Sequence, residues 1–146
     1  MKKLLVLAVA LVTAAGISVA IATASPSGGG DLHLKKECSE YTGLADSFCT
    51  ITASNVKAIK VGSRVVYLKA AGTTSLDSDI VLVVGPGNYA LGHVTLDLAT
   101  GQGAVSLSGG AGQFTSFRAK AHVSPPGGVN GADWAWDGWY SFGQRD

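Results

Sequence analysis

The chain has 146 residues, of which 14% are charged, and its eleven lysines and arginines nearly balance its ten aspartates and glutamates. Because no basic stripe or run of like charge occurs, the composition argues against nucleic acid and anionic membrane surfaces as main partners. This length fits one domain with its own core, and we expect it to fold without a metal site or a cofactor.

The first residues have the pattern of a secretory signal peptide. Lys2 and Lys3 precede an apolar run over residues 4–15. The small-x-small pattern that signal peptidase recognises then ends at Ala24. We therefore expect residues 1–24 to be cleaved and the protein to be secreted, with no membrane partner after cleavage. The alternative is an uncleaved anchor, because about 20 apolar residues can span a bilayer.

The next segment contains a linker-like stretch and then two cysteines. Residues 25–36 are polar and rich in glycine, and we expect them to form a flexible leader that includes His33. The β-barrel domain is then expected to occupy residues 37–146. Cys38 and Cys49 are the only two cysteines of the chain. An even pair in an exported chain predicts a disulfide, which for a loop of this size is worth about 3 kcal/mol in the chain-entropy model.

Alternation of apolar and polar residues dominates the rest of the chain and predicts strands. Over residues 117–123, odd positions are apolar and even positions are polar, which is typical of a strand with one buried face. Gly62-Ser63 predicts a tight hairpin between two β-rich arms. The predicted strands cover residues 49–54, 56–61, 64–70, 79–84, 89–98, 104–109, 114–124 and 134–142. Short connections favour pairing in sequence order, so the predicted fold is an all-β, antiparallel up-and-down barrel of about eight strands, with a β-sandwich as the alternative.

The segment over residues 134–142 is rich in aromatic side chains, with the sequence WAWDGWYSF. In a regular strand, Trp139 would share the outer face with Asp137 and Ser141, and the other aromatic side chains would face the interior. The inward set is Trp134, Trp136, Tyr140 and Phe142. Two alternatives stay open at Asp137-Gly138, which also fits a type I′ hairpin or a bulge that shifts the register.

Residues 107–123, with the sequence LSGGAGQFTSFRAKAHV, contain a glycine-rich turn that enters a long strand. Gly109, Gly110, Gly112 and Phe114 fall on a Gly-Gly-x-Gly-x-Phe motif. Over roughly residues 80–142 the chain resembles allene oxide cyclases and plant dirigent proteins, and in particular bacterial secreted proteins with such a barrel. The resemblance implies an eight-stranded antiparallel barrel with an interior cavity, in which the glycines form a structural turn and Phe114 closes one end. It transfers no catalytic residue, because the inward positions are overwhelmingly apolar, and it leaves an isomerase or cyclase activity open.

The titratable side chains form no recognisable catalytic or metal-binding set. His93 and Asp97 would share one strand face but lie ~13 Å apart, which is too far to share a metal or a proton. A cross-strand partner for His93 stays open. Asp77 and Asp79 are expected to be solvated loop acids, because two carboxylates fall short of the about six to eight oxygens that calcium takes. His122 is expected to be solvated, and the catalytic residues, if any, stay unknown.

Two hypotheses of function follow from these patterns. In the first, the barrel holds a small apolar molecule, and the four inward aromatic residues of 134–142 are among its lining. In the second, the interior is packed and the outer surface binds a glycan or a protein through Trp139 and Tyr89. An empty interior pocket above ~300 Å³ would favour the first hypothesis, and a filled interior would favour the second. The sequence leaves ligand identity and oligomeric state open.

Overall fold

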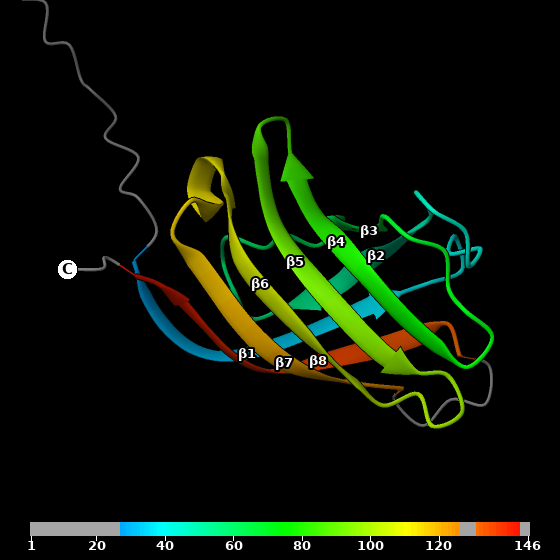
Figure 1. The fold of residues 1–146 in the computed structure, drawn as a ribbon. Helices are drawn as coiled ribbons and strands as arrows, with labels where there is room; N and C mark the ends of the chain where they lie inside the picture. The colour runs from blue at the N-terminus through cyan, green and yellow to red at the C-terminus, as the bar shows by residue number, and fades with distance from the viewer. Residues whose placement is uncertain (1–26, 126–130, 144–146) are drawn as a thin grey trace, which may run out of the picture.

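The computed structural model describes residues 27–125 and 131–143, which form a closed antiparallel barrel (Figure 1). Its strands are β1 (Gly28–Glu37), β2 (Phe48–Ser54), β3 (Arg64–Tyr67), β4 (Ser75–Gly85), β5 (Asn88–Asp97), β6 (Gly103–Ala111), β7 (Phe117–Ser124) and β8 (Asp133–Phe142). A short 3-10 helix, η1 (Gly112–Phe114), connects β6 to β7. The predicted barrel of about eight strands is confirmed, and the sandwich alternative is wrong because the sheet closes on itself.

The ring is closed by pairing between the first strand and the last. Every strand pairs with its neighbour in sequence, and β1 also pairs with β8. This seam runs from Gly28 opposite Phe142 to Glu37 opposite Asp133 without a break in register. Because a closed sheet leaves no unpaired terminal strand, the backbone groups of β1 and β8 find partners within the barrel.

The strand β1 corrects the prediction of a flexible leader over residues 25–36. Leu32, Leu34 and Lys36 alternate with exposed residues and point into the barrel. The glycines at the start of this segment resemble a linker, but β8 supplies a partner for each of their positions. The domain therefore begins before the predicted boundary at Glu37. The predicted signal peptide, residues 1–24, lies outside the described residues.

A second correction concerns residues 56–61, which form turns rather than the predicted strand. Val56 and Ile59 are both buried, and the Ile59 amide donates a hydrogen bond to the Val56 carbonyl. Their spacing of three residues reflects a tight turn that covers the core, whereas strand alternation would need an even spacing. The Gly62 amide donates to the carbonyl of Ile51, so Gly62-Ser63 ends this connection and is not the predicted two-residue hairpin.

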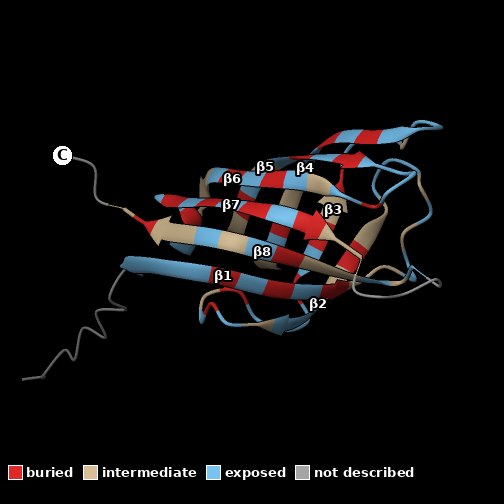
Figure 2. Ribbon diagram, turned by 90° about the horizontal axis from the view of Figure 1, so that it is seen from below, coloured by how far each residue is buried: buried red, intermediate tan, exposed pale blue. Residues whose placement is uncertain are grey.

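Strand β8 follows the predicted alternation through its full length. Its register against β7 continues from Phe117 opposite Phe142 to Ser124 opposite Ala135. Neither the hairpin nor the bulge that Asp137-Gly138 left open is present. Figure 2 shows buried and exposed residues alternating along the strands of the barrel. Apolar side chains from the strands fill most of the interior.

One end of the barrel is closed by an aromatic cluster. Phe114 of η1 is fully buried, and its ring packs edge-on against Phe117 with centroids 5.3 Å apart. Phe142 and Tyr140 of β8 complete the cluster. The turn before Phe114 needs a glycine at position 112. Gly112 has a φ of 63°, and a Cβ there would meet the carbonyl of Gly87, in the turn between β4 and β5, at 2.7 Å. The predicted positive φ of Gly112 is therefore confirmed, and Phe114 occupies the end of the barrel.

Candidate ligand-binding cavity

The end of the barrel opposite the aromatic cluster contains a cavity of about 220 Å³. It lies where β1 ends and where β4 and β8 begin. Among its lining residues are Lys36, Tyr41, Tyr67, Leu96, Leu98 and Trp134. Leu98 is exposed, so the cavity reaches the surface at this rim. No helix in the described part of the chain is long and apolar enough to span a membrane.

A disulfide forms part of the cavity wall. Cys38 directly follows β1 and Cys49 lies in β2, and the two sulfur atoms are 2.11 Å apart. The register explains the juxtaposition, because Glu37 pairs with Thr50 and the cysteines are their neighbours. The predicted pairing of Cys38 with Cys49 is confirmed. The bond links the end of β1, which carries Lys36, to β2, and β2 pairs with β3, which carries Tyr67.

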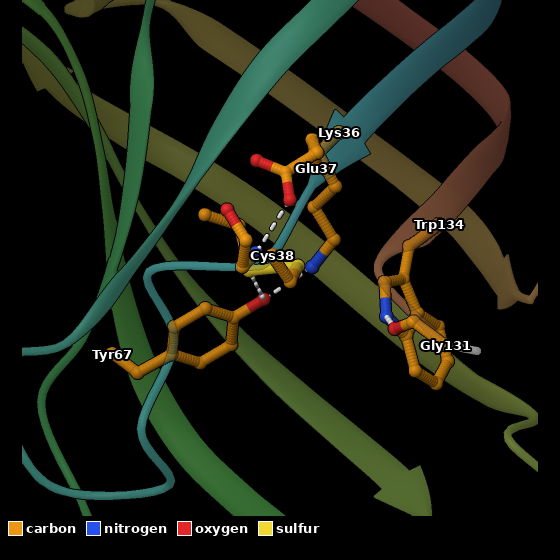
Figure 3. Close-up of a disulfide and its surroundings, with 8 residues drawn as sticks. Lys36, Glu37, Cys38, Tyr67, Gly131 and Trp134 are labelled. Carbon is orange, nitrogen blue, oxygen red and sulfur yellow. Dashed lines mark hydrogen bonds between the residues drawn. A yellow bond between two sulfur atoms is a disulfide. The ribbon is translucent and has the colours of Figure 1, made fainter.

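Lys36 is the main polar group of the cavity. Its side chain is inward on β1 and only 4% exposed. Nζ donates a hydrogen bond to the hydroxyl oxygen of Tyr67. It also lies 5.0 Å from the centre of the Tyr67 ring and 4.9 Å from that of Trp136. Figure 3 shows the amine directed at the Tyr67 hydroxyl beside the disulfide, with Trp134 on the other side.

The charge of Lys36 is poorly supported in this environment. No carboxylate of the described residues lies within salt-bridge distance of its Nζ. Burial disfavours the ammonium and lowers the pKa of Lys36 to about 7. The faces of the Tyr67 and Trp136 rings favour the cation, by about 2 kcal/mol or more for a desolvated contact. With a pKa of about 7, the neutral amine and the ammonium of Lys36 are both populated near neutral pH.

Two tyrosines complete the polar side of the cavity. Burial raises the pKa of Tyr67, and the nearby Tyr41 raises it further, so Tyr67 stays a phenol. Burial also raises the pKa of Tyr41. The rings of the two tyrosines lie 4.8 Å apart. The Tyr41 hydroxyl is buried and has no hydrogen-bond partner among the described residues, and the same holds for the indole Nε1 of Trp136. Such orphaned groups cost free energy unless a ligand or water satisfies them.

The structure separates the four aromatic residues that were predicted to line one ligand site. Trp134 lines the cavity, and its Nε1 donates to the Gly131 carbonyl at 2.8 Å. Trp136 lies beside the Lys36 amine. Tyr140 and Phe142 belong to the aromatic cluster at the opposite end. The inward face of β8 therefore contributes to both ends of the barrel, and the cavity draws its polar groups from β1, from Tyr41 in the segment after β1, and from β3.

The two predicted surface-binding residues lie apart. Trp139 is 46% exposed and lines a groove of about 520 Å³ on the outside of the barrel. Other lining residues of this groove are His93, Ser106, Lys120, His122 and Asp137. Tyr89 is partly buried near the start of β5 and is absent from the groove lining. The groove therefore includes Trp139 and does not include Tyr89.

The acidic residues of β4 have a different environment from the predicted one. Asp77 and Asp79 lie on a strand and flank His93, at 2.6 Å from Nε2 and 2.8 Å from Nδ1. The prediction of loop acids is wrong, although both carboxylates are exposed as expected. On the same outer surface, His33 Nδ1 lies 2.7 Å from an oxygen of Asp137. Within residues 27–125 and 131–143, no group of histidine, cysteine and acidic residues has a metal-binding arrangement.

Comparisons with protein-family models, curated proteins and solved structures found no match to this chain. The barrel that the resemblance implies is present, with its glycine turn and Phe114 at one end. Membership of the allene oxide cyclase and dirigent group stays a prediction from the motif. Lys36 and Tyr67 were not predicted as site residues. The usable signal was the alternation of Leu32, Leu34 and Lys36, which places a lysine at an inward position.

Proposed function

We propose that this protein binds a small, mainly apolar molecule that carries one polar group in the cavity beside Lys36. The observation that carries the proposal is an apolar cavity with a buried amine on its wall and a buried, unpartnered hydroxyl of Tyr41 among the described residues. Ligand sites combine apolar walls with a few convergent polar groups in this way. The orphaned hydroxyl would gain a partner from the polar end of the ligand.

The volume of the cavity limits the size of the ligand. At about 220 Å³ it falls short of the ~300 Å³ that was expected to favour an interior ligand and that marks the lower end of common ligand pockets, so the proposal depends on the polar groups of the cavity and not on its volume. An apolar cavity of about 150 Å³ is nevertheless large enough to bind benzene. A molecule with one aromatic ring or a short aliphatic chain therefore fits, whereas a whole long-chain fatty acid would have to extend past the rim at Leu98.

We propose further that the protein acts outside the cytosol. The Cys38–Cys49 disulfide supports this location, because such bonds persist in oxidising compartments and are rare in the reducing cytosol. The signal-peptide pattern of residues 1–24 supports the same conclusion from the sequence. Mass spectrometry of the exported protein would test both points. A mature N-terminus near Ser25 and the absence of free thiols are expected.

Binding can be tested with toluene and benzyl alcohol as probes. The expected result is a saturable shift of the Trp134 indole resonance in NMR titrations, because Trp134 lines the cavity. Benzyl alcohol should bind more tightly than toluene, because its hydroxyl reaches a polar group that toluene leaves unpartnered. A proton spectrum of the tryptophan indoles suffices for the measurement, and unchanged Trp139 signals would locate the effect inside the barrel.

A pair of matched variants separates the cavity from the rest of the surface. Leu98→Trp should block the rim and weaken binding at least about tenfold, which corresponds to about 1.4 kcal/mol. Leu91→Trp places the same side chain at an exposed position of β5 that does not line the cavity, and it should leave binding unchanged. Equal affinities in the two variants, or no saturable shift in the parent protein, would contradict the proposal.

A second candidate function is supported by the groove around Trp139. An exposed indole next to Lys120, His122 and Asp137 fits a glycan, because the C–H face of a sugar packs on the ring while its hydroxyls bond to the polar side chains. Calorimetric titration with neutral oligosaccharides tests this function, because the heat of binding does not need a tryptophan as reporter. Trp139→Ala should abolish the response, and Leu91→Ala, at another exposed position, should preserve it. A response that survives Trp139→Ala would contradict the groove as the site.

A further inference from the structure

The Lys36 amine is buried, and its surroundings are also those of a reactive amine. Lys36 lines the cavity, and its Nζ has no carboxylate partner among the described residues. A lysine that served only to stabilise the fold would gain more from an ion pair, since a buried charge without one is costly. Desolvated lysines in apolar pockets are instead suited to act as amine nucleophiles.

We propose, resting on the ligand-binding function above, that Lys36 forms an imine with a small apolar aldehyde or ketone held in the cavity. The nitrogen lone pair attacks the carbonyl carbon, and the carbonyl oxygen takes up a proton to give a carbinolamine. Loss of the hydroxyl group as water then forms the C=N bond. Both hydrogens of the neutral amine leave with the oxygen, so the reaction is a condensation that needs no oxidant or reductant.

Tyr67 is placed to assist both proton transfers. Its hydroxyl is hydrogen-bonded to Nζ, which is the atom that attacks. Burial raises the pKa of Tyr67, so the group remains a phenol that can donate to the carbonyl oxygen and to the departing hydroxyl. Burial lowers the pKa of Lys36 to about 7, so free amine is present at neutral pH. The cavity wall thus places a nucleophile, the Lys36 amine, next to a proton donor, the Tyr67 hydroxyl.

The surroundings also determine which carbonyl compounds can react. Leu96 and Val94 line the cavity with apolar side chains, and Trp134 supplies an aromatic face. A charged carbonyl compound would lose its hydration without gaining a counter-ion, because no other charged side chain is among the lining residues that the structure describes. The expected substrate class is therefore an uncharged aldehyde or ketone with a ring or a short chain.

Reductive trapping tests the proposal on the unmodified protein. Benzaldehyde is added at about pH 7 with cyanoborohydride, which reduces an imine to a stable secondary amine and leaves the disulfide intact. Peptide mapping then gives the rate of modification of each lysine. Lys36 is expected to react at least about tenfold faster than the exposed Lys120, because each unit of pKa depression raises the neutral fraction about tenfold. Excess toluene should slow the labelling of Lys36 and not that of Lys120.

Size provides an independent control. Pyrenecarboxaldehyde carries the same reactive group on a ring system too large for the cavity, so it should label Lys120 and spare Lys36. Leu98→Trp should slow the reaction of Lys36 with benzaldehyde, whereas Leu91→Trp should not. Tyr67→Phe keeps the amine and removes the proton donor, and it should slow imine formation without moving the label to another lysine.

The outcomes distinguish this inference from the ligand-binding proposal. If toluene binds but Lys36 reacts no faster than Lys120, the imine proposal is overturned and the binding function stands. If the pyrene aldehyde labels Lys36 as fast as benzaldehyde does, the amine is reached by opening of the barrel. The proposal that the cavity selects small carbonyl compounds is then overturned. Selective labelling by benzaldehyde without any binding of toluene would support the imine and contradict a general preference for apolar ligands.

Discussion

Trp136 and Trp139 lie three residues apart on β8 and point to opposite sides of the barrel wall. Trp136 is 1% exposed and contacts the Lys36 amine inside, whereas Trp139 is 46% exposed and lines the outer groove. The odd spacing places them on opposite faces, because side chains alternate along a strand. Two residues of the same type on one strand therefore contribute differently to stability and to surface recognition.

Replacement of each tryptophan by alanine separates these contributions. Trp136→Ala should reduce the free energy of unfolding by about 3–5 kcal/mol, because it removes a large buried ring from the core. Trp139→Ala should reduce it by less than about 1 kcal/mol, since surface substitutions have small effects. Urea denaturation of both variants provides the comparison. A larger loss for Trp139→Ala would mean that the strand has a different register from the one described.

The buried Lys36 should make stability depend on pH. Its pKa is about 7 in the folded protein and 10.5 when unfolded, so between these values the unfolded chain binds more protons. Stability should therefore rise as the pH increases from about 7 to about 10, by about 1.4 kcal/mol per unit at most. Lys36→Met should remove this rise, and Lys120→Met should retain it. Chemical denaturation across this range is the measurement, and parallel curves for the parent and Lys36→Met would contradict it.

His93 should titrate above its ordinary pKa of 6.5. Its hydrogen bond to Asp79 raises the pKa of the imidazole most, and the bond to Asp77 raises it further. The stabilisation from these pairs is complete below pH 6.5 and is lost as the pH rises through the raised pKa. NMR titration of the His93 ring protons measures the shift directly. Asp79→Asn should lower the His93 pKa more than Asp77→Asn does, and the reverse order would contradict the assignment.

Removal of the disulfide should destabilise the cavity end of the barrel. A closed loop with a sequence separation of 11 is worth about 3 kcal/mol in the chain-entropy model. Cys38→Ser with Cys49→Ser should therefore lower the melting temperature by roughly 6–24 °C, at about 2–8 °C per kcal/mol for a domain of this size. Calorimetry with and without reductant provides the test on the parent protein. An unchanged melting temperature after verified reduction would show that the bond contributes nothing to stability.

The glycine turn before Phe114 should tolerate no β-branched residue. Gly112 combines a φ of 63° with close approach to the Gly87 carbonyl, so Gly112→Val should cost about 1–3 kcal/mol. Gly85→Val is the matched control, because a Cβ there meets nothing within 4 Å and its φ is not positive. Thermal unfolding of the two variants measures the difference. Equal stabilities of the two variants would contradict the strain that is inferred at Gly112.

Local patterns predicted those parts of the fold that have a simple alternation and few irregularities. The aromatic strand β8 and the strand after Phe114 have regular periods and no bulge against each other, so their register could be read from the sequence. The disulfide followed from the cysteine count. Strand β1 was missed because its glycines resemble a linker and its lysines resemble a solvated surface. Val56 and Ile59 led to the wrong prediction of a strand over residues 56–61, because buried turn residues are as apolar as buried strand residues.

The candidate cavity depended on contacts that no single segment carries. Lys36 and Tyr67 are 31 positions apart in the chain, and Trp136 reaches the amine only because β8 closes on β1. Alternation can place a lysine on an inward face, but it cannot show whether another strand supplies a carboxylate that pairs with it. The inward positions were correctly predicted to be mostly apolar, but the sequence did not single out Lys36, the buried amine that gives the cavity its chemistry.

The seam between β1 and β8 makes the starting point of the chain arbitrary. Gly28 lies directly across from Phe142, so a short linker between these residues would leave every strand interface intact. The chain could then be opened instead at the tight turn between Gly85 and Asn88, which lies at the aromatic end of the barrel. Such a circular permutant would keep the cavity, its disulfide and Lys36 at the opposite end. We therefore expect the barrel to tolerate a change in strand order that keeps every pair of neighbouring strands.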